Sequence, residues 1–325
     1  MLGLKWRSCF IGCVAGLLLF GATFVQAQAY PNRPLRMIVP QGAGGGTDIL
    51  ARFVAQRLSE GFGQQVVIEN RPGAGGIIGV EAAAKAPADG YTLMIGSNTT
   101  MAANVGLYAK LPFDPVRDFT PLAMAAAAHF VIAVHPSVPA TNMAELIALA
   151  RSKPGQLNVG FGTSSAQICG EMLRAMAGIS VAMVPYRSSP QALNDLLAGQ
   201  VQVICEPLVT SAPHAKAGKL KLLAIASPKR STLAPELPPV SDTVPGFDYV
   251  AWVAFYAPAG IPRDVHARLS GELLKILNSP DNIEKIKAIG GFEPIPAGPD
   301  ELARVQKADI VRLTKIIKEA GIKAE

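Results

Sequence analysis

The sequence predicts an α/β fold on three observations. Short β-rich apolar runs alternate with helical patterns along the chain, which favours parallel sheets covered by helices. Glycine or small polar residues follow several of the expected strands and start the next helix. No repeat or low-complexity linker divides the 325 residues, although this length permits two lobes. Two lobes joined by crossing segments would leave a cleft where strand ends and helix starts converge.

The expected strands are short runs rich in apolar and β-branched residues. They lie at Leu35–Val39, Gln65–Glu69, Thr92–Gly96, His129–Val134, Leu157–Phe161, Val181–Pro185, Val201–Cys205, Lys221–Ala226 and Val250–Tyr256. The segment Pro228–Pro245 is rich in Pro, Ser and Thr, which is typical of a loop or crossover rather than of a free tether.

Helix boundaries are predicted from periodicity, capping residues and proline. Asp48–Leu58 places its apolar residues on one helical face. Asn142 stands three residues before Glu145, which is the spacing of a reciprocal capping box. Further helices are expected from Ser189 to Gly199, from Pro262 and from Pro299, the last two being the final helices of the chain.

The first 29 residues have the pattern of a secretory signal peptide. Lys5 and Arg7 precede an apolar stretch without acids, and Ala27-Gln28-Ala29 supplies the small residues of a cleavage site. The apolar stretch is shorter than the roughly 20 residues that a bilayer-spanning helix needs. We therefore expect cleavage after Ala29 and a soluble, exported mature protein.

The charge of the chain bears on its partners, and its cysteines bear on a possible disulfide. The formal net charge of +6 is spread along the chain without a basic stripe, so no nucleic-acid partner is expected. Cys169 and Cys205 remain after the signal peptide. In an oxidising compartment they could form a disulfide, but they could equally be buried as small apolar residues, and the sequence leaves both possibilities open.

The motifs of common enzymes are incomplete. Gly42-Ala43-Gly44 would begin a dinucleotide fingerprint, but Thr47 occupies the position of the third glycine. Gly162-Thr163-Ser164-Ser165-Ala166 approaches a nucleophile elbow, yet the four histidines lie in no recognisable catalytic or metal-binding pattern. We expect no catalytic residue, no metal and no cofactor.

The remaining signal is a set of helix starts suited to anion binding. The glycine-rich turn Gly42–Gly46 lies between a strand and a helix, where free backbone N–H groups and the helix dipole attract negative charge. Small polar residues also start helices at Ser97–Thr100, Thr163–Ser165 and Ser188-Ser189. Each alone would serve as an ordinary N-cap. Their repetition after successive strands predicts a shared cleft in which neutral donors hold an anion.

Several characteristic segments follow one another in order along the chain. They are Ile38-Val39-Pro40 with Gly44-Gly45-Gly46-Thr47-Asp48, Glu69-Asn70-Arg71-Pro72-Gly73-Ala74-Gly75-Gly76, Ala88-Asp89-Gly90-Tyr91-Thr92-Leu93, Leu111-Pro112-Phe113-Asp114-Pro115 with Asp118-Phe119, Pro185-Tyr186-Arg187, Asp195-Leu196-Leu197-Ala198-Gly199-Gln200-Val201, Ala217-Gly218-Lys219-Leu220 and Ala257-Pro258-Ala259-Gly260. They extend from about residue 31 nearly to the C-terminus. In this ordered set of segments the chain resembles the periplasmic solute-binding receptors of tripartite tricarboxylate transporters, the Bug family.

The resemblance implies a two-lobed periplasmic-binding-protein fold of type II with two crossing connections and a ligand cleft between the lobes. Lobe 1 would comprise residues 30–127 and 228–325, and lobe 2 residues 128–227. The lobes would close on a small carboxylate, such as a di- or tricarboxylate, an aromatic acid or an amino acid. The protein would be a periplasmic monomer whose partners are the membrane subunits of a transporter.

The resemblance also implies a set of ligand contacts. Carried over by position, they are Gly45, Gly46, Thr47, Asp48, Ser97, Asn98 and Thr99 in lobe 1, and Ser164, Ser165, Tyr186, Ser188 and Glu206 in lobe 2. The chain departs from the family pattern at Gln41, Gly42, Gln167 and Gln202, and has Glu206 where the family often has Asp. Arg187 is interpreted as a solvated side chain.

Two other functions stay open at this point. The same fold could present its ligand to a membrane sensor instead of a transporter, and the two uses differ in partner but not in the chemistry of the cleft. An exported α/β hydrolase would instead turn over the bound acid.

Overall fold

A mixed sheet organises the chain over residues 30–319 and 321–322, which the computed structural model describes. The signal peptide expected over residues 1–29 lies outside the described residues. The sheet belongs to the unit that begins at Arg33. Its strands are β1 (Leu35–Val39), β2 (Val66–Asn70), β3 (Thr92–Ser97), β4 (Phe119–Val134), β5 (Asn158–Phe161), β6 (Ala182–Pro185), β7 (Val203–Pro207), β8 (Lys221–Ile225), β9 (Val250–Pro258) and β10 (Phe292–Ala297). The order across the sheet is β2-β1-β3-β9-β4-β7-β5-β6, and β8 and β10 also pair with β4.

Strand β4 connects two halves of this sheet. From Phe119 to His129 it pairs with antiparallel β9, whereas from Phe130 to Val134 it pairs with antiparallel β7. Parallel strands β1, β2 and β3 belong to the first half, and parallel strands β5, β6 and β7 to the second. The change of partner lies close to the lobe boundary expected between residues 127 and 128, although the division into lobes stays a prediction.

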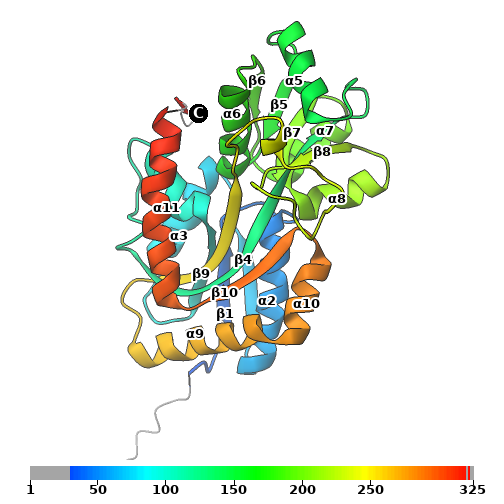
Figure 1. Cartoon of the computed structure of the whole chain (residues 1–325). Coiled ribbons are helices and arrows are strands. Elements are labelled where there is room, and N and C mark those ends of the chain that lie inside the picture. Colours follow the sequence, from blue (N-terminus) through cyan, green and yellow to red (C-terminus); the bar gives the residue numbers. More distant parts are fainter. Residues whose placement is uncertain (1–29, 320, 323–325) are drawn as a thin grey trace, which may run out of the picture. The chain divides into compact units, whose positions relative to one another are not determined.

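Helices cover both faces of the sheet, as expected for an α/β fold. They are α2 (Gly46–Phe62), α3 (Ile77–Ala84), α4 (Asn104–Leu107), α5 (Met143–Ser152), α6 (Ser164–Ala177), α7 (Ser189–Leu197), α8 (Leu208–Lys216), α9 (Arg263–Asn278), α10 (Pro280–Ile289) and α11 (Pro299–Glu319), with the short turns η1 (Ala74–Gly76), η2 (Thr99–Ala103) and η3 (Val240–Asp242). Figure 1 shows α2 and α10 on one side of the first half, and α3 and α11 on the other. No helix in this part of the chain is both long and apolar enough to cross a membrane.

The hydrophobic core of the first half lies under α3 and α11. Val80 of α3 and Leu302 of α11 pack with Met94 of β3 and Tyr256 of β9, and all four side chains are buried. On the other face, α2 packs against β1, β2 and α9. A second cluster, around Leu196, joins α7 to β7. The sheet therefore holds the strand ends and helix starts of both halves in fixed positions.

Each expected strand is present within two residues of its expected start, except one. The strand expected at His129–Val134 begins at Phe119 instead. Its first part is rich in alanine and contains Pro121, which argue against a strand, but pairing with β9 and β10 buries it and outweighs those propensities. Strand β10, which contains two prolines, and helix α10 were not expected. Proline is tolerated in β10 because, among the described strands, this strand pairs with β4 alone.

The predicted capping box at Asn142 is half confirmed. The Asn142 side chain accepts a hydrogen bond from the Glu145 backbone N–H at 2.9 Å. The Glu145 carboxylate, however, accepts from the backbone N–H and the hydroxyl of Thr141, at 2.7 and 2.9 Å, so the reciprocal bond goes to the residue before the cap.

A disulfide joins Cys169 of α6 to Cys205 of β7. Both residues are buried, and their Cα atoms are 6.1 Å apart. The bond ties α6 to the strand beneath it, which resolves the alternatives that the sequence left open.

Candidate ligand-binding site

A cavity of about 630 Å³ lies between the two halves of the sheet. The first half contributes the loop after β1, the glycine-rich segment before α3, the start of η2 and Tyr108. The second half contributes the start of α6 and the loop after β6. The lining residues are Pro40, Gln41, Gly42, Pro72, Gly73, Ala74, Gly75, Gly76, Ile78, Thr99, Thr100, Tyr108, Phe161, Gly162, Thr163, Ser164, Ser165, Gln167, Pro185, Tyr186 and Arg187.

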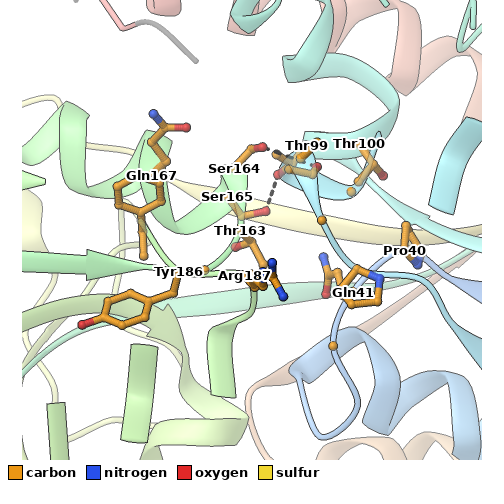
Figure 2. Close-up of a pocket in the computed structure, with 18 of the residues that line it drawn as sticks. Pro40, Gln41, Thr99, Thr100, Thr163, Ser164, Ser165, Gln167, Tyr186 and Arg187 are labelled. Atoms are coloured by element: carbon orange, nitrogen blue, oxygen red, sulfur yellow. Dashed lines mark hydrogen bonds between the residues drawn. The ribbon is translucent and has the colours of Figure 1, made fainter. Parts of the chain in front are cut away.

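Hydroxyl groups from both halves meet at this cavity. Thr99 Oγ1 and Ser165 Oγ share a hydrogen bond (Figure 2). Ser164 Oγ donates to the Gly75 carbonyl oxygen at 3.4 Å. Thr163 caps α6, because its Oγ1 accepts from the Ala166 backbone N–H. The first N–H groups of a helix lack partners within it, so the start of α6 adds donors to this wall of the cavity.

Burial raises the pKa of two tyrosines beside these hydroxyls above the ordinary value, at which a tyrosine is already neutral near pH 7. Burial raises the pKa of Tyr249 to about 12, while the nearby hydroxyls of Thr99 and Ser165 lower it in part. The Tyr249 hydroxyl lies close to that pair but outside good hydrogen-bond geometry. Burial likewise raises the pKa of Tyr108, and the Ser164 hydroxyl lowers it in part. Both tyrosines therefore add no negative charge near the cavity.

A much smaller chamber of about 20 Å³ adjoins the cavity. Gln41, Thr163 and Ser165 line both spaces. The chamber is also lined by Gly46, Thr47, Ser97 and Ser189, so it collects residues from all four of the donor-rich helix starts. Its volume suits about one water molecule rather than an organic ligand.

Asp48, a predicted ligand contact, is bonded to residues of the first half of the sheet and its loops. Its carboxylate accepts hydrogen bonds from the Gly44 backbone N–H at 2.9 Å, from Arg52 at 2.8 Å and from Asn70 at 2.8 Å. Burial raises the pKa of Asp48, but these bonds outweigh it and leave the pKa below its ordinary value. Asn70 also donates to the Gln41 carbonyl oxygen at 3.1 Å. Asp48 and Asn70 thus fix the glycine-rich loop, and Asp48 lines neither space.

Glu206, also predicted to contact the ligand, is fully buried in β7. Its Oε1 accepts from the Ser189 hydroxyl at 3.0 Å, whereas Oε2 has no hydrogen-bond partner among the described residues. Burial raises the pKa of Glu206 from its ordinary value of 4.5 to about 8, and the bond from Ser189 lowers it in part. The side chain lines neither the cavity nor the chamber.

The remaining predicted ligand contacts fall into three groups: residues that line the cavity, residues that line the chamber and residues that line neither. Thr99, Ser164, Ser165 and Tyr186 line the cavity, and Gly46, Thr47 and Ser97 line the chamber. Gly45, Asn98 and Ser188 line neither. In Figure 2 the Tyr186 ring points away from the hydroxyls of α6 and η2. It packs with the apolar cluster around Leu196. As ligand contacts, all twelve residues stay predictions.

The glycine-rich segment before α3 carries part of the family resemblance but was not expected to line the site. Gly75 has φ +61°, and a Cβ there would lie 2.1 Å from Ser164 Oγ and 2.7 Å from the Tyr108 hydroxyl. Gly76 has φ +91°, and a Cβ there would lie 2.8 Å from Thr100 Cγ2. Glycine is therefore required by close approach as well as by conformation. Two glycines in succession before a helix are the sequence signal that could have identified this wall.

The polar groups of the lining are mainly hydrogen-bond donors that would suit an anion. The described residues around the cavity supply hydroxyls, amides and the guanidinium of Arg187, without a His, Asp or Glu beside the serines. Such donors can hold a carboxylate by charge-assisted hydrogen bonds. Within the described residues, no group of His, Cys, Asp and Glu is arranged to hold a metal ion.

Known proteins resemble this chain over most of its length. A family model described as the tripartite tricarboxylate transporter family receptor matches residues 50–322. Protein BugT of Bordetella pertussis (strain Tohama I) is 34% identical over 303 residues, which is 92% of this chain and 93% of BugT. The solved structure of an R. palustris protein with adipate has a TM-score of 0.88 and 36% identity, covering 90% of this chain and 99% of that one. MatC from Rhodopseudomonas palustris, with bound malate, has a TM-score of 0.83 and 28% identity, covering 89% and 100%.

Proposed function

Since the chain belongs to the tripartite tricarboxylate transporter receptor family, we propose that its cavity captures a small carboxylate, which the protein then delivers to the membrane subunits of a transporter. The observation that carries this proposal is the meeting of hydroxyl donors from both halves of the sheet at one cavity whose described lining contains no acid. The fold is that of periplasmic binding proteins, and the structural neighbours are binding proteins rather than enzymes.

In this proposal the ligand carboxylate lies at the start of α6 and accepts hydrogen bonds from Thr99, Ser164 and Ser165. Neutral donors and the positive end of a helix are sufficient to hold an anion that is removed from water. The absence of an acid among the described lining residues disfavours a ligand ammonium group, because none of them would balance its charge.

We also propose that residues 30–127 with 228–325, and residues 128–227, act as two lobes that open and close around the ligand. Two contacts between the halves support this: the Thr99–Ser165 hydrogen bond and the close approach of Gly42 to Ser188, where a Cβ on Gly42 would lie 2.7 Å from Ser188 Cβ. A ligand that bonds to both walls would stabilise the closed arrangement by its differential affinity.

The structural neighbours support the class of ligand. The R. palustris protein was solved with adipate and MatC with malate, and both ligands are dicarboxylates. The lining of the cavity in this chain includes the amides of Gln41 and Gln167, and a ligand screen identifies the particular acid.

A thermal-shift screen with aliphatic di- and tricarboxylates, aromatic acids, amino acids and neutral sugars tests the proposal. A ligand at a hundred times its dissociation constant should stabilise the protein by about 2.7 kcal/mol and raise the melting temperature. A rise with a neutral sugar and with none of the acids would contradict a carboxylate receptor. The ligand should also be recovered unchanged after long incubation, whereas turnover would indicate an exported enzyme.

Delivery requires a separate measurement. The ligand-loaded protein should support uptake in vesicles that contain the membrane subunits, and uptake should fail when this protein is omitted. Ligand binding without any stimulation of uptake would leave the receptor intact and would refute its role in transport.

A further inference from the structure

We propose that Arg187 selects ligands with two anionic groups, pairing with a second carboxylate while the hydroxyls around Thr99 and Ser165 hold the first. The proposal rests on the proposed function, because it needs a carboxylate in the cavity. It replaces the interpretation of Arg187 as a merely solvated side chain.

Arg187 differs from the other arginines because it lines the cavity and its guanidinium has no partner among the described residues. Among the described residues that line the cavity, it has the one charged side chain. No hydrogen bond, ion pair or ring contact occupies its guanidinium in the described structure. Most other described arginines are engaged, as in the pairs of Arg52 with Asp48 and Arg174 with Glu171. A guanidinium without a carboxylate beside a cavity is available to an anionic ligand.

The backbone holds Arg187 in position while its side chain remains exposed. It follows β6, and its backbone N–H donates to Gln191 Oε1 of α7 at 3.3 Å. The preceding Tyr186 is fixed by a backbone bond to the Phe161 carbonyl oxygen at 2.8 Å. In Figure 2 the Arg187 side chain points toward Gln41, on the wall that the first half of the sheet contributes.

The distribution of charge separates two binding regions. The hydroxyls of Thr99, Ser164 and Ser165 lie together at the junction of η2 and α6, with neutral tyrosines nearby. Arg187 comes from a different loop, after β6. A monocarboxylate bound by the hydroxyls would leave the guanidinium unpaired. A second carboxylate could form two parallel hydrogen bonds with it, in the planar geometry that arginine favours.

Titration calorimetry with acids of matched chain length tests this selection. The acid pairs are adipate with hexanoate and succinate with butyrate, and the proteins are the mature wild type, Arg187→Gln and Arg263→Gln. Arg263 is a suitable control, because it is an exposed arginine at the start of α9, lines neither the cavity nor the chamber and has no partner in the described structure. Both variants remove one positive charge.

Arg187→Gln should weaken binding of the better dicarboxylate roughly tenfold or more and change binding of its monocarboxylate partner by about twofold at most. Arg263→Gln should change neither. Arg187→Lys should retain part of the selectivity, because it keeps the charge but loses the bidentate geometry. Raising the salt concentration should reduce the dicarboxylate preference of the wild type more than that of Arg187→Gln.

Three results would be decisive against the selection. Unchanged dicarboxylate affinity in Arg187→Gln would overturn it, and so would an equal loss for both members of a pair. If Arg263→Gln removed the dicarboxylate preference to the same extent as Arg187→Gln, the preference would arise from net charge rather than from Arg187. Binding of none of the acids to the wild type would refute the proposed function itself, which is a distinguishable outcome. Unchanged melting temperatures of the unliganded variants will confirm that each is folded.

Discussion

Thr99 and Ser165 share a hydrogen bond that joins η2 in the first half of the sheet to the start of α6 in the second. Their hydroxyls are buried and line the cavity, with Tyr249 close behind them. A hydroxyl that bonds across a cleft can exchange this partner for a ligand oxygen. The pair is therefore well placed to couple ligand binding to contact between the halves.

Ser165→Ala should weaken binding of the best acid by roughly 1.5–3 kcal/mol, because a hydroxyl that bonds a charged group contributes about this much. Titration calorimetry measures the loss. Ser152→Ala is the matched control, since within the described residues that hydroxyl bonds only the Leu149 carbonyl oxygen, near the end of α5. Equal affinities for the wild type and Ser165→Ala would remove this hydroxyl from the binding site.

Gly75→Ala should impair both stability and binding. The left-handed conformation at φ +61° costs an alanine about 1–2 kcal/mol. The added Cβ would also meet Ser164 Oγ at 2.1 Å and displace it from the cavity wall. Denaturant unfolding and calorimetry would measure the two effects.

Gly155→Ala separates conformational strain from the clash at Gly75. Gly155 has φ +74°, but a Cβ added there would meet no atom within 4 Å, and the residue does not line the cavity. It should therefore lose stability without losing affinity. If Gly75→Ala binds the ligand as well as Gly155→Ala does, the close approach of Gly75 to Ser164 has no role in binding.

The sequence indicated the donors that depend on local pattern. Thr99, Ser164 and Ser165 start helices after strands, and both the cavity and the chamber are found at those starts. It did not indicate that Gly75 and Gly76 form part of the wall, because the close approaches that require glycine there come from Ser164 and Thr100, which lie far away in the chain. It also left Asp48 ambiguous, since its role depends on Asn70 at the end of another strand.

The same limit applies to the fold. Helix α7 followed from Ser189-Pro190 and Gly199, which are local signals. The first part of β4 did not, because an alanine-rich run becomes a strand only when neighbouring strands bury it on both edges. Local propensity therefore predicted elements such as α7, whose conformation is set by their own residues. It failed for the first part of β4, where pairing with neighbouring strands decides the conformation.

Asp48→Asn should reduce stability by roughly 1–3 kcal/mol, because the amide cannot accept all three hydrogen bonds of the carboxylate. Its pKa lies below the ordinary value of 3.8, so its contribution is present above that pH and is lost as the pH falls through the folded pKa. Affinity for a plain carboxylic acid should stay unchanged or increase, since a nearby negative charge is removed.

Urea unfolding and calorimetry would measure these effects, with Asp264→Asn as the control. Asp264 is an exposed acid in the first turn of α9. A large and selective loss of amino-acid binding in Asp48→Asn would instead assign Asp48 to a ligand ammonium group.

Glu206→Gln should change how stability depends on pH. The pKa of Glu206 is raised to about 8 by burial, so between pH 4.5 and 8 the folded protein retains a proton that the unfolded chain releases. The free energy of unfolding should therefore fall as the pH rises through this window and level off above it. Glutamine preserves the shape and the acceptor for Ser189 but does not titrate. The free energy of unfolding of the variant should match that of the wild type near pH 4.5 and exceed it at pH 8 by an amount on the order of a few kcal/mol.

Urea unfolding at about pH 5, 6.5 and 8 gives the difference in unfolding free energy between the two proteins. The contributions of the other titrating groups cancel in this difference. Glu236→Gln, at an exposed glutamate, should show no such trend. A constant difference between Glu206→Gln and the wild type across this range would mean that Glu206 is ionised in the folded protein at neutral pH.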